Sequence, residues 1–165
     1  MTARIPVAVA GGKNVVAFLD MLAWSEIGPE LLSKSDDGYN VLVGSTPQKP
    51  LLFDSYGAHP DAYDPKTNST AAGRYQFLSR YWPHYRDLLR LPDFGPVSQD
   101  RYAIQLMQER KALQPIIAGN IQAAIALVSN IWASLPGAGY QQREHSLADL
   151  LAAYKNAGGS IARAA

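Results

Sequence analysis

A short apolar helix that ends at a carboxylate is the feature that most constrains this chain. Apolar side chains recur at intervals of three and four residues, which places them on one face of a helix: Val15, Phe18, Leu19, Leu22 and Ile27. Asn14 can cap the start of this helix. Gly28 and Pro29 end it, because proline cannot continue a helix. Glu26 therefore lies in the last turn.

The position of Glu26 gives its carboxyl group surroundings suited to acid catalysis. The last backbone carbonyls of a helix carry a partial negative charge, which disfavours a nearby carboxylate. Apolar neighbours, Trp24 and Ile27, disfavour the charged form further. A carboxyl group that stays protonated near neutral pH can act as a general acid. Glu26 is therefore our candidate catalytic residue, and the alternative is an ordinary solvated glutamate at a helix end.

Composition narrows the class of protein and argues against bound groups. The chain has 165 residues, a net charge of +1 and no cysteine, which excludes disulfides and thiolate metal sites. Its three histidines are far apart, so a histidine metal site has no support, and we expect no metal and no cofactor. Arginines and aromatic residues cluster over 74–90, but the near-zero charge argues against a nucleic-acid partner.

We predict a single domain over residues 15–165, preceded by a flexible N-terminal leader over residues 1–14. The apolar run in the leader is too short for a signal peptide and contains proline. The run over 121–128 is too short to span a membrane, since a spanning helix needs about 20 residues. The protein is therefore expected to fold in the cytoplasm.

The predicted fold class is α+β, mostly helical, with a small antiparallel β-hairpin inserted after the first helix. The hairpin is predicted over 38–44 and 51–54, because both runs are β-rich and a turn region separates them. A long loop follows over 54–72. Further helices are predicted over 74–90 (divided or begun at Pro83), 98–111, 121–131 and from a cap at Ser146. Glu26 lies where hairpin and helices join, which is where we expect the substrate cleft.

Two further stretches carry candidate substrate-binding residues. Tyr75 and Gln76 follow a run of small residues and can hydrogen-bond to sugar hydroxyls and N-acetyl groups, although a plain helix start explains them as well. Asn130, Ser134 and Tyr140 belong to a stretch that combines polar groups, an aromatic face and a glycine-rich loop. For that stretch, the alternative is a buried tryptophan in a core helix followed by a turn.

Four motifs in one order resemble the lambda/P2-type bacteriophage endolysins, over about residues 15–159: FLDMLAWSE at 18–26, GYNVLVG at 38–44, STAAGRYQ at 69–76 and NIWASLPGAGY at 130–140. The resemblance implies a lysozyme-like fold with the hairpin beside the cleft. It also implies lytic transglycosylase activity, which breaks the β-1,4 bond between N-acetylmuramic acid and N-acetylglucosamine and leaves a 1,6-anhydro sugar. Glu26 matches the catalytic acid of this family, and Gly73–Gln76 and Tyr140 resemble substrate-contacting motifs.

The resemblance further implies partners and a route. The partners are peptidoglycan glycan strands and a hole-forming membrane protein, a holin. The enzyme is then a monomer that stays in the host cytoplasm until it is released to the periplasm.

The sequence departs from the family pattern at three places, and two alternative functions stay open. Asn40 stands where we expect aspartate, Ile27-Gly28-Pro29 replaces Gly-Thr after the glutamate, and Gln141 replaces a glycine. One alternative is a hydrolytic muramidase on the same fold, in which Asp37 or Asp54 positions a water. The other is a wall-binding or tail-associated protein without catalysis.

Overall fold

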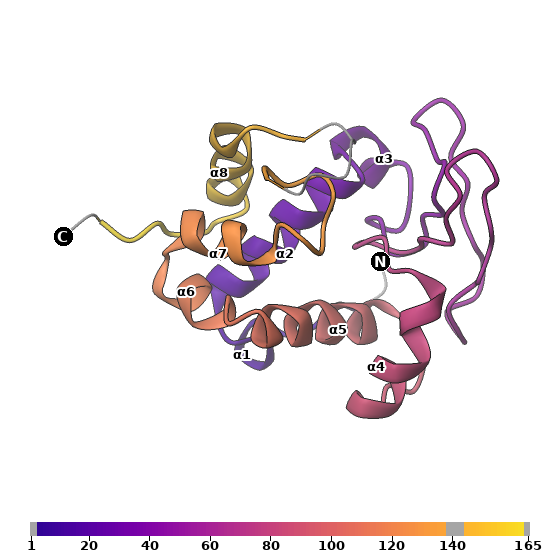
Figure 1. Ribbon diagram of the computed structural model, residues 1–165, viewed down its shortest axis with the longest axis horizontal. Coiled ribbons are helices and arrows are strands. Elements are labelled where there is room, and N and C mark those ends of the chain that lie inside the picture. The colour runs from indigo at the N-terminus through magenta and orange to yellow at the C-terminus, as the bar shows by residue number, and fades with distance from the viewer. Residues whose placement is uncertain (1–2, 138–143, 164–165) are drawn as a thin grey trace. The chain divides into compact units, whose positions relative to one another are not determined.

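A computed structural model gives the structure of residues 3–137 and 144–163, and most of its regular structure is helical (Figure 1). In chain order, the helices of these residues are α1 (Val7–Ala10), α2 (Lys13–Glu26), α3 (Pro29–Ser33), the 3-10 helix η1 (Ser79–Tyr81), α4 (Trp82–Leu89), α5 (Pro96–Glu109), α6 (Leu113–Ala118), α7 (Ile121–Val128) and α8 (Leu147–Asn156). No helix within these residues is long and apolar enough to cross a membrane.

The chain forms two compact units, each built from two separate stretches of the sequence. Unit 1 contains residues 1–5 and 26–102, and unit 2 contains residues 6–25 and 103–165. Two helices therefore pass from one unit into the other: α2 belongs to unit 2 up to its last residue, and α5 changes units after Tyr102. These units do not follow the boundary that we predicted at residue 14, and the single catalytic domain stays a prediction.

Residues 3–12, which we assigned to a flexible leader, contain ordered structure. Val7–Ala10 form α1, and Ile5 and Ala10 are buried. Within unit 1, the backbone N–H of Ile5 donates to a carboxylate oxygen of Asp100 at 3.1 Å. The segment before α2 therefore contributes a buried apolar side chain and a buried hydrogen bond to the fold.

The helix that carries Glu26 has the extent and burial that its spacing predicts. α2 ends at Glu26, and the predicted inward residues Val15, Phe18, Leu19 and Leu22 are fully buried. Ile27, predicted on the same face, follows the helix and is partly buried. Asn14 does not cap α2, because the helix already begins at Lys13. Its side chain instead donates to the carbonyl of Ile117 at 3.2 Å and accepts from the N–H of Ser160 at 3.0 Å. It thus connects the start of α2 to α6 and to the segment after α8.

The rest of unit 2 is a succession of short helices. α6 contacts α7, and α7 contacts α8, as Figure 1 shows. The predicted cap at Ser146 is confirmed, since its hydroxyl accepts from the N–H of Asp149 at 3.1 Å. Gly119 lies between α6 and α7 with a φ of 84°, and its carbonyl accepts from the N–H of Ala162 at 3.0 Å.

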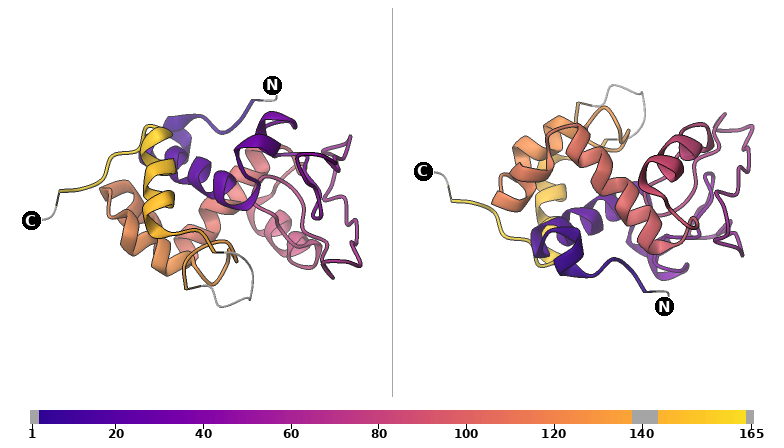
Figure 2. Two further views of the ribbon diagram at one scale, coloured as in Figure 1. Left: turned by 90° about the horizontal axis from the view of Figure 1, so that it is seen from above. Right: turned by 90° about the horizontal axis from the view of Figure 1, so that it is seen from below.

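The predicted β-hairpin is wrong: in unit 1 the described residues form isolated β-bridges and no strand (Figure 2). Val41 pairs with Leu52 and Leu42 pairs with Ala72. The pairing is interrupted at Leu51: its carbonyl accepts from the N–H of Leu42 at 2.9 Å and from the Ser45 hydroxyl at 2.8 Å, but its N–H donates to that hydroxyl at 2.8 Å instead of to the backbone. Pro50, which precedes Leu51, has no N–H to donate to a backbone ladder. The N–H of Leu51 is thus taken by a side chain and Pro50 has none, so no continuous backbone ladder forms here.

The segment after the long loop also differs from its prediction. Helix begins only at Ser79, because Ala72 and Phe77 exchange two backbone hydrogen bonds, of 3.0 and 2.9 Å, around a tight turn. Gly73 and Gln76 in this turn have φ values of 83° and 51°, which a helix cannot contain. Pro83 lies in the first turn of α4, as predicted.

The buried ring of His59 predicts a loss of stability in mild acid. One ring nitrogen bonds the carbonyl of Phe77 at 2.7 Å and the other accepts from the N–H of Asp61 at 3.0 Å, so the native ring is neutral. Burial lowers the pKa of His59 below 6.5, against the opposing effect of the Phe77 carbonyl. Stability from the neutral ring is present above pH 6.5 and is lost as the pH falls through the native pKa.

We expect the free energy of unfolding, measured with urea between pH 7.5 and pH 5, to fall more steeply with decreasing pH in the parent protein than in His59→Gln. The glutamine side chain at residue 59 does not titrate. The two remaining histidines and all carboxylates are common to both proteins and cancel in the comparison. Equal slopes would show that His59 is as easily protonated in the folded chain as in the unfolded one.

Candidate functional site

The candidate acid Glu26 is the last residue of α2 and is partly buried. The chain turns directly after it, since Gly28 has a φ of 85° and Pro29 begins α3. The last carbonyls of a helix have no partner within the helix, so the end of α2 needs other groups to hold it. Those groups are found around the residue that precedes Glu26.

Ser25 is held from two sides by the segment that follows α7. Its hydroxyl donates to the hydroxyl of Ser134 at 2.6 Å, and its carbonyl accepts from Nε2 of His145 at 3.1 Å. The two residues that hold Ser25 are also bonded to each other, because the N–H of His145 donates to the carbonyl of Ser134 at 2.9 Å. The His145 ring also lies 4.7 Å from the ring of Trp24, centroid to centroid. Two consecutive residues before Glu26 are therefore restrained within unit 2.

The contacts around Ser25 involve one predicted site residue, Ser134, and one residue that was not predicted, His145. Ser134, predicted to contact substrate, is buried, and its hydroxyl contacts the helix end. His145 was not predicted, because its partner Ser25 lies 120 residues away and no local pattern joins them. His145 lies within residues 15–159, over which the sequence resembles the endolysin family, and this was the available signal.

Asn130 and Tyr140 are not brought into this arrangement by the described contacts. Asn130 is exposed, and with its amide oriented to suit its neighbours its oxygen accepts from both terminal nitrogens of the Arg110 guanidinium at 3.2 Å. Tyr140 lies outside the described residues. Substrate contacts by both stay predictions.

In unit 1, the turn that carries the other predicted residues is built around a buried carboxylate. Asp100 accepts hydrogen bonds from the hydroxyls of Tyr75 at 2.5 Å and Tyr39 at 2.9 Å, and from the N–H of Ile5. Nε of Arg4 lies 3.9 Å from the same carboxylate. Burial raises the pKa of Asp100, while the bond from Tyr75 opposes that rise. Burial also raises the pKa of Tyr39 and Tyr75, so both phenols remain hydrogen-bond donors.

Tyr75 is fully buried within this cluster, 5.7 Å from the ring of Phe77. Its hydroxyl is already engaged by Asp100. The structure gives Tyr75 a place in the core of unit 1, and a contact with substrate, which stays a prediction, requires that the side chain be uncovered. Gln76 is partly exposed, and its amide donates to the carbonyl of Gly73 at 2.9 Å.

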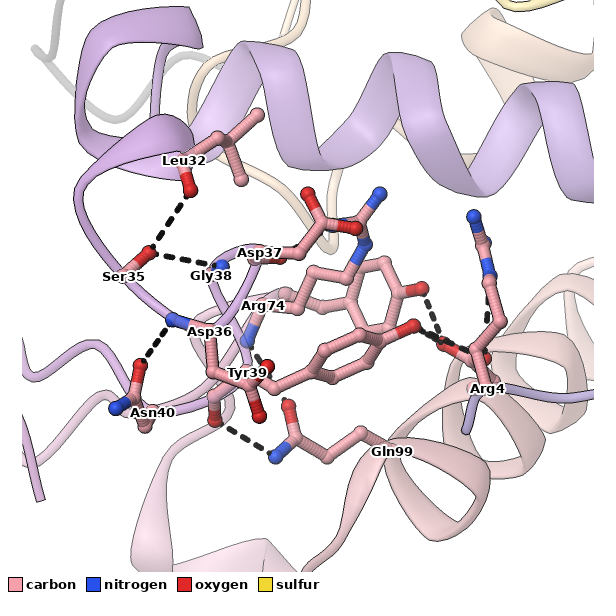
Figure 3. A network of polar contacts seen from close by, with 12 residues as sticks. Arg4, Leu32, Ser35, Asp36, Asp37, Gly38, Tyr39, Asn40, Arg74 and Gln99 are labelled. Carbon is pink, nitrogen blue, oxygen red and sulfur yellow. Dashed lines mark hydrogen bonds and ion pairs between the residues drawn. The ribbon is translucent and has the colours of Figure 1, made fainter. Parts of the chain in front are cut away.

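Arg74 and Gln99 join the same turn to the loop after α3 (Figure 3). Nη1 of the buried Arg74 lies 2.8 Å from the carboxylate of Asp37 and also donates to the Asp37 carbonyl. The amide of Gln99 accepts from the N–H of Arg74 at 2.9 Å and donates to the carbonyl of Tyr39 at 2.9 Å. A buried amide thus connects two segments that are far apart in the sequence.

The two carboxylates that a hydrolytic muramidase could use, Asp37 and Asp54, and the adjacent Asp36 have different surroundings. Asp37 is paired with Arg74, and Asp36 accepts from the hydroxyl of Tyr56 at 2.6 Å. Asp54 is exposed. Asn40, which stands where we expected an aspartate, accepts the N–H of Asp36 at 2.9 Å through its side-chain oxygen (Figure 3). An amide oxygen serves this turn as well as a carboxylate oxygen does. Over residues 3–137 and 144–163, no three histidine or acidic side chains gather as metal ligands do.

Comparison with known proteins identifies close relatives along nearly the whole chain. Residues 16–161 match the family model described as Endolysin. The endolysin of Escherichia phage P2 is 51% identical over 155 residues, which cover 89% of this chain and 94% of the relative. The endolysin of Escherichia phage lambda is 51% identical over 149 residues, which cover 88% of this chain and 91% of the relative.

A solved structure extends the likeness to the fold. Bacteriophage lambda lysozyme complexed with a chitohexasaccharide has a TM-score of 0.81 and 46% identity, and the match covers 98% of this chain and 100% of that one. The predicted lysozyme-like, mostly helical fold is therefore confirmed, without the hairpin.

The close approach of Gly73 and Gln99 predicts a cost for any side chain at residue 73. Gly73 has a φ of 83°, and a Cβ there would overlap the amide of Gln99. We expect Gly73→Ala to lower the free energy of unfolding by about 1–3 kcal/mol from the backbone conformation alone, with a further cost if Gln99 loses its bond to Arg74. Chemical denaturation measures this change.

The control is Gly57→Ala in the same unit, where the glycine is exposed, its φ is not left-handed, and the nearest contact of a Cβ is Ser55 Oγ at 3.4 Å. Its stability should change by less than about 0.5 kcal/mol. A Gly73→Ala protein as stable as this control would contradict the account of the turn.

Proposed function

Because this chain belongs to the endolysin family, we propose that it breaks the β-1,4 bond between N-acetylmuramic acid and N-acetylglucosamine in peptidoglycan without consuming water. In general terms it is a phage-type lysozyme, an enzyme that degrades peptidoglycan and so lyses the bacterial cell. The finer proposal is a lytic transglycosylase. The observation that carries it is the place of Glu26 as the last residue of a buried helix, next to Ser25, which is held by two hydrogen-bonding side chains, Ser134 and His145.

The proposed reaction uses one carboxyl group twice. Protonated Glu26 gives its proton to the glycosidic oxygen, and the bond between that oxygen and C1 of the muramic acid breaks. The cation that develops at C1 is stabilised by the substrate's own N-acetyl group. The Glu26 carboxylate then takes the proton from the 6-hydroxyl of the same sugar, whose oxygen bonds to C1. The products are a 1,6-anhydro sugar and a free 4-hydroxyl, and Glu26 is protonated again.

The surroundings of the other carboxylates support a mechanism with one acid. Glycosidases that use water generally need a second carboxylate to activate it. Asp37 is engaged by Arg74, and Asp36 by the hydroxyl of Tyr56, so both have partners that a water would have to replace. Asp54 is exposed, which makes it the remaining candidate for a hydrolytic mechanism.

We propose that the glycan strand of peptidoglycan is the substrate, as the β-1,4-linked chitohexasaccharide bound to the lambda lysozyme supports. Gln76, Asn130 and Tyr140 are the proposed contacts with its hydroxyl and N-acetyl groups. Tyr75 and Ser134 are kept in this set, and their burial favours a supporting part in which they hold the residues that contact the sugar.

The enzyme is proposed to act as a monomer and to accumulate in the host cytoplasm until a holin opens the membrane to the periplasm. This route follows from the family. The holin is a functional partner, and the proposal requires no direct contact with it.

Replacement of the acid tests the mechanism directly. We expect Glu26→Gln to fold as the parent protein does, because the amide has the same shape, and to lose activity by about 10²-fold to 10⁴-fold, because it cannot supply a proton. Mass spectrometry of fragments released from purified peptidoglycan should show products lighter than hydrolysis products by one water with the parent protein, and none with the variant.

Other outcomes distinguish the alternatives. Fragments that carry oxygen from labelled water would establish a hydrolytic muramidase and direct the search to Asp54. A folded Glu26→Gln protein with full activity would refute the assignment of the acid. Parent protein that sediments with peptidoglycan but releases no fragments would be a wall-binding protein without catalysis.

A further inference from the structure

His145 satisfies a backbone group that the helix itself leaves open. Ser25 is the penultimate residue of α2, so its carbonyl is one of the last four that accept no hydrogen bond within the helix. The only polar donor that the described contacts bring to this carbonyl is Nε2 of His145, at 3.1 Å. Since a carbonyl cannot donate, Nε2 must carry the hydrogen, which fixes the protonation of that nitrogen.

The bond acts on the peptide group that bears Glu26. The carbonyl of Ser25 and the N–H of Glu26 belong to one planar peptide, so a bond to the carbonyl restrains the direction in which the Glu26 side chain leaves the backbone. Helix ends fray when they are not held. A small displacement of a catalytic group is costly: about 1 Å can reduce the rate by about 10²-fold.

We propose that His145 is a positioning residue, whose Nε2–H holds the Ser25–Glu26 peptide in the orientation that general-acid catalysis needs. This inference rests on the proposed role of Glu26. His145 itself neither touches the reacting atoms nor exchanges a proton with the substrate. Its own backbone is fixed to Ser134, which holds the Ser25 hydroxyl, so the donor and the group it restrains are parts of one arrangement.

A purely structural role would act through a different contact of the same ring. The ring lies 4.7 Å from that of Trp24 at an interplanar angle of 50°, which is a normal packing contact of aromatic rings. The two roles require different properties of the side chain, because packing needs a flat ring and positioning needs a donor at Nε2. Two substitutions separate these properties.

His145→Phe keeps the ring and removes the donor, whereas His145→Gln removes the ring and keeps an amide N–H at the reach of Nε2. If His145 positions the peptide, His145→Phe should lose at least about tenfold in kcat on soluble glycan strands, with KM within about twofold of the parent value. His145→Gln should retain most of kcat. The melting temperature of each variant shows whether it is folded at the assay temperature.

The reverse order, with His145→Gln impaired and His145→Phe normal, would assign the ring to packing and overturn the proposal. Equal kcat values in both variants, whether normal or reduced, would overturn it too, because the donor would then make no difference. Glu26→Gln measured alongside separates the two levels of inference. If Glu26→Gln is inactive and His145→Phe is normal, only the positioning role fails; if Glu26→Gln is active, the proposed function fails as well.

Discussion

The buried carboxylate of Asp100 is the group on which the order of unit 1 depends. It gathers two tyrosine hydroxyls and a backbone N–H from segments around residues 5, 39 and 75, none of which is near it in the sequence. A buried acceptor that loses such partners costs about 1–3 kcal/mol or more, so each bond is much harder to remove than its net contribution suggests. Because no strand in the described part of unit 1 supplies a backbone ladder, side-chain hydrogen bonds carry much of the specification that a sheet normally provides.

The neighbouring Gln99 shows the same principle in an uncharged form. Its single amide accepts from Arg74 and donates to the carbonyls of Tyr39 and Phe94, so donor and acceptor are both used inside the protein. Such an amide fits only where the backbone comes close, and Gly73 provides that closeness because it lacks a Cβ. The motif around residues 73–76 therefore has a structural reason to exist that is independent of any contact with sugar.

Local signals in the sequence located several helices but did not show the connections between them. Periodicity and the Gly-Pro stop placed Glu26 in the last turn of α2, and the predicted cap at Ser146 and first-turn proline Pro83 are confirmed. The hairpin prediction was wrong because β-rich composition does not show that the Ser45 hydroxyl will accept the N–H of Leu51 and so interrupt the backbone pairing. Contacts such as Ser25 with Ser134, 109 residues apart, leave no trace in local spacing, so the support of the candidate site had to come from the structure.

The end of α2 illustrates why a catalytic carboxyl group is well placed on a helix that is otherwise buried. A rigid helix fixes the position of its last residue only if the last turn is prevented from opening, and the bonds to Ser25 meet that need from outside the helix. The candidate acid at this position is therefore oriented by contacts that the helix itself cannot supply.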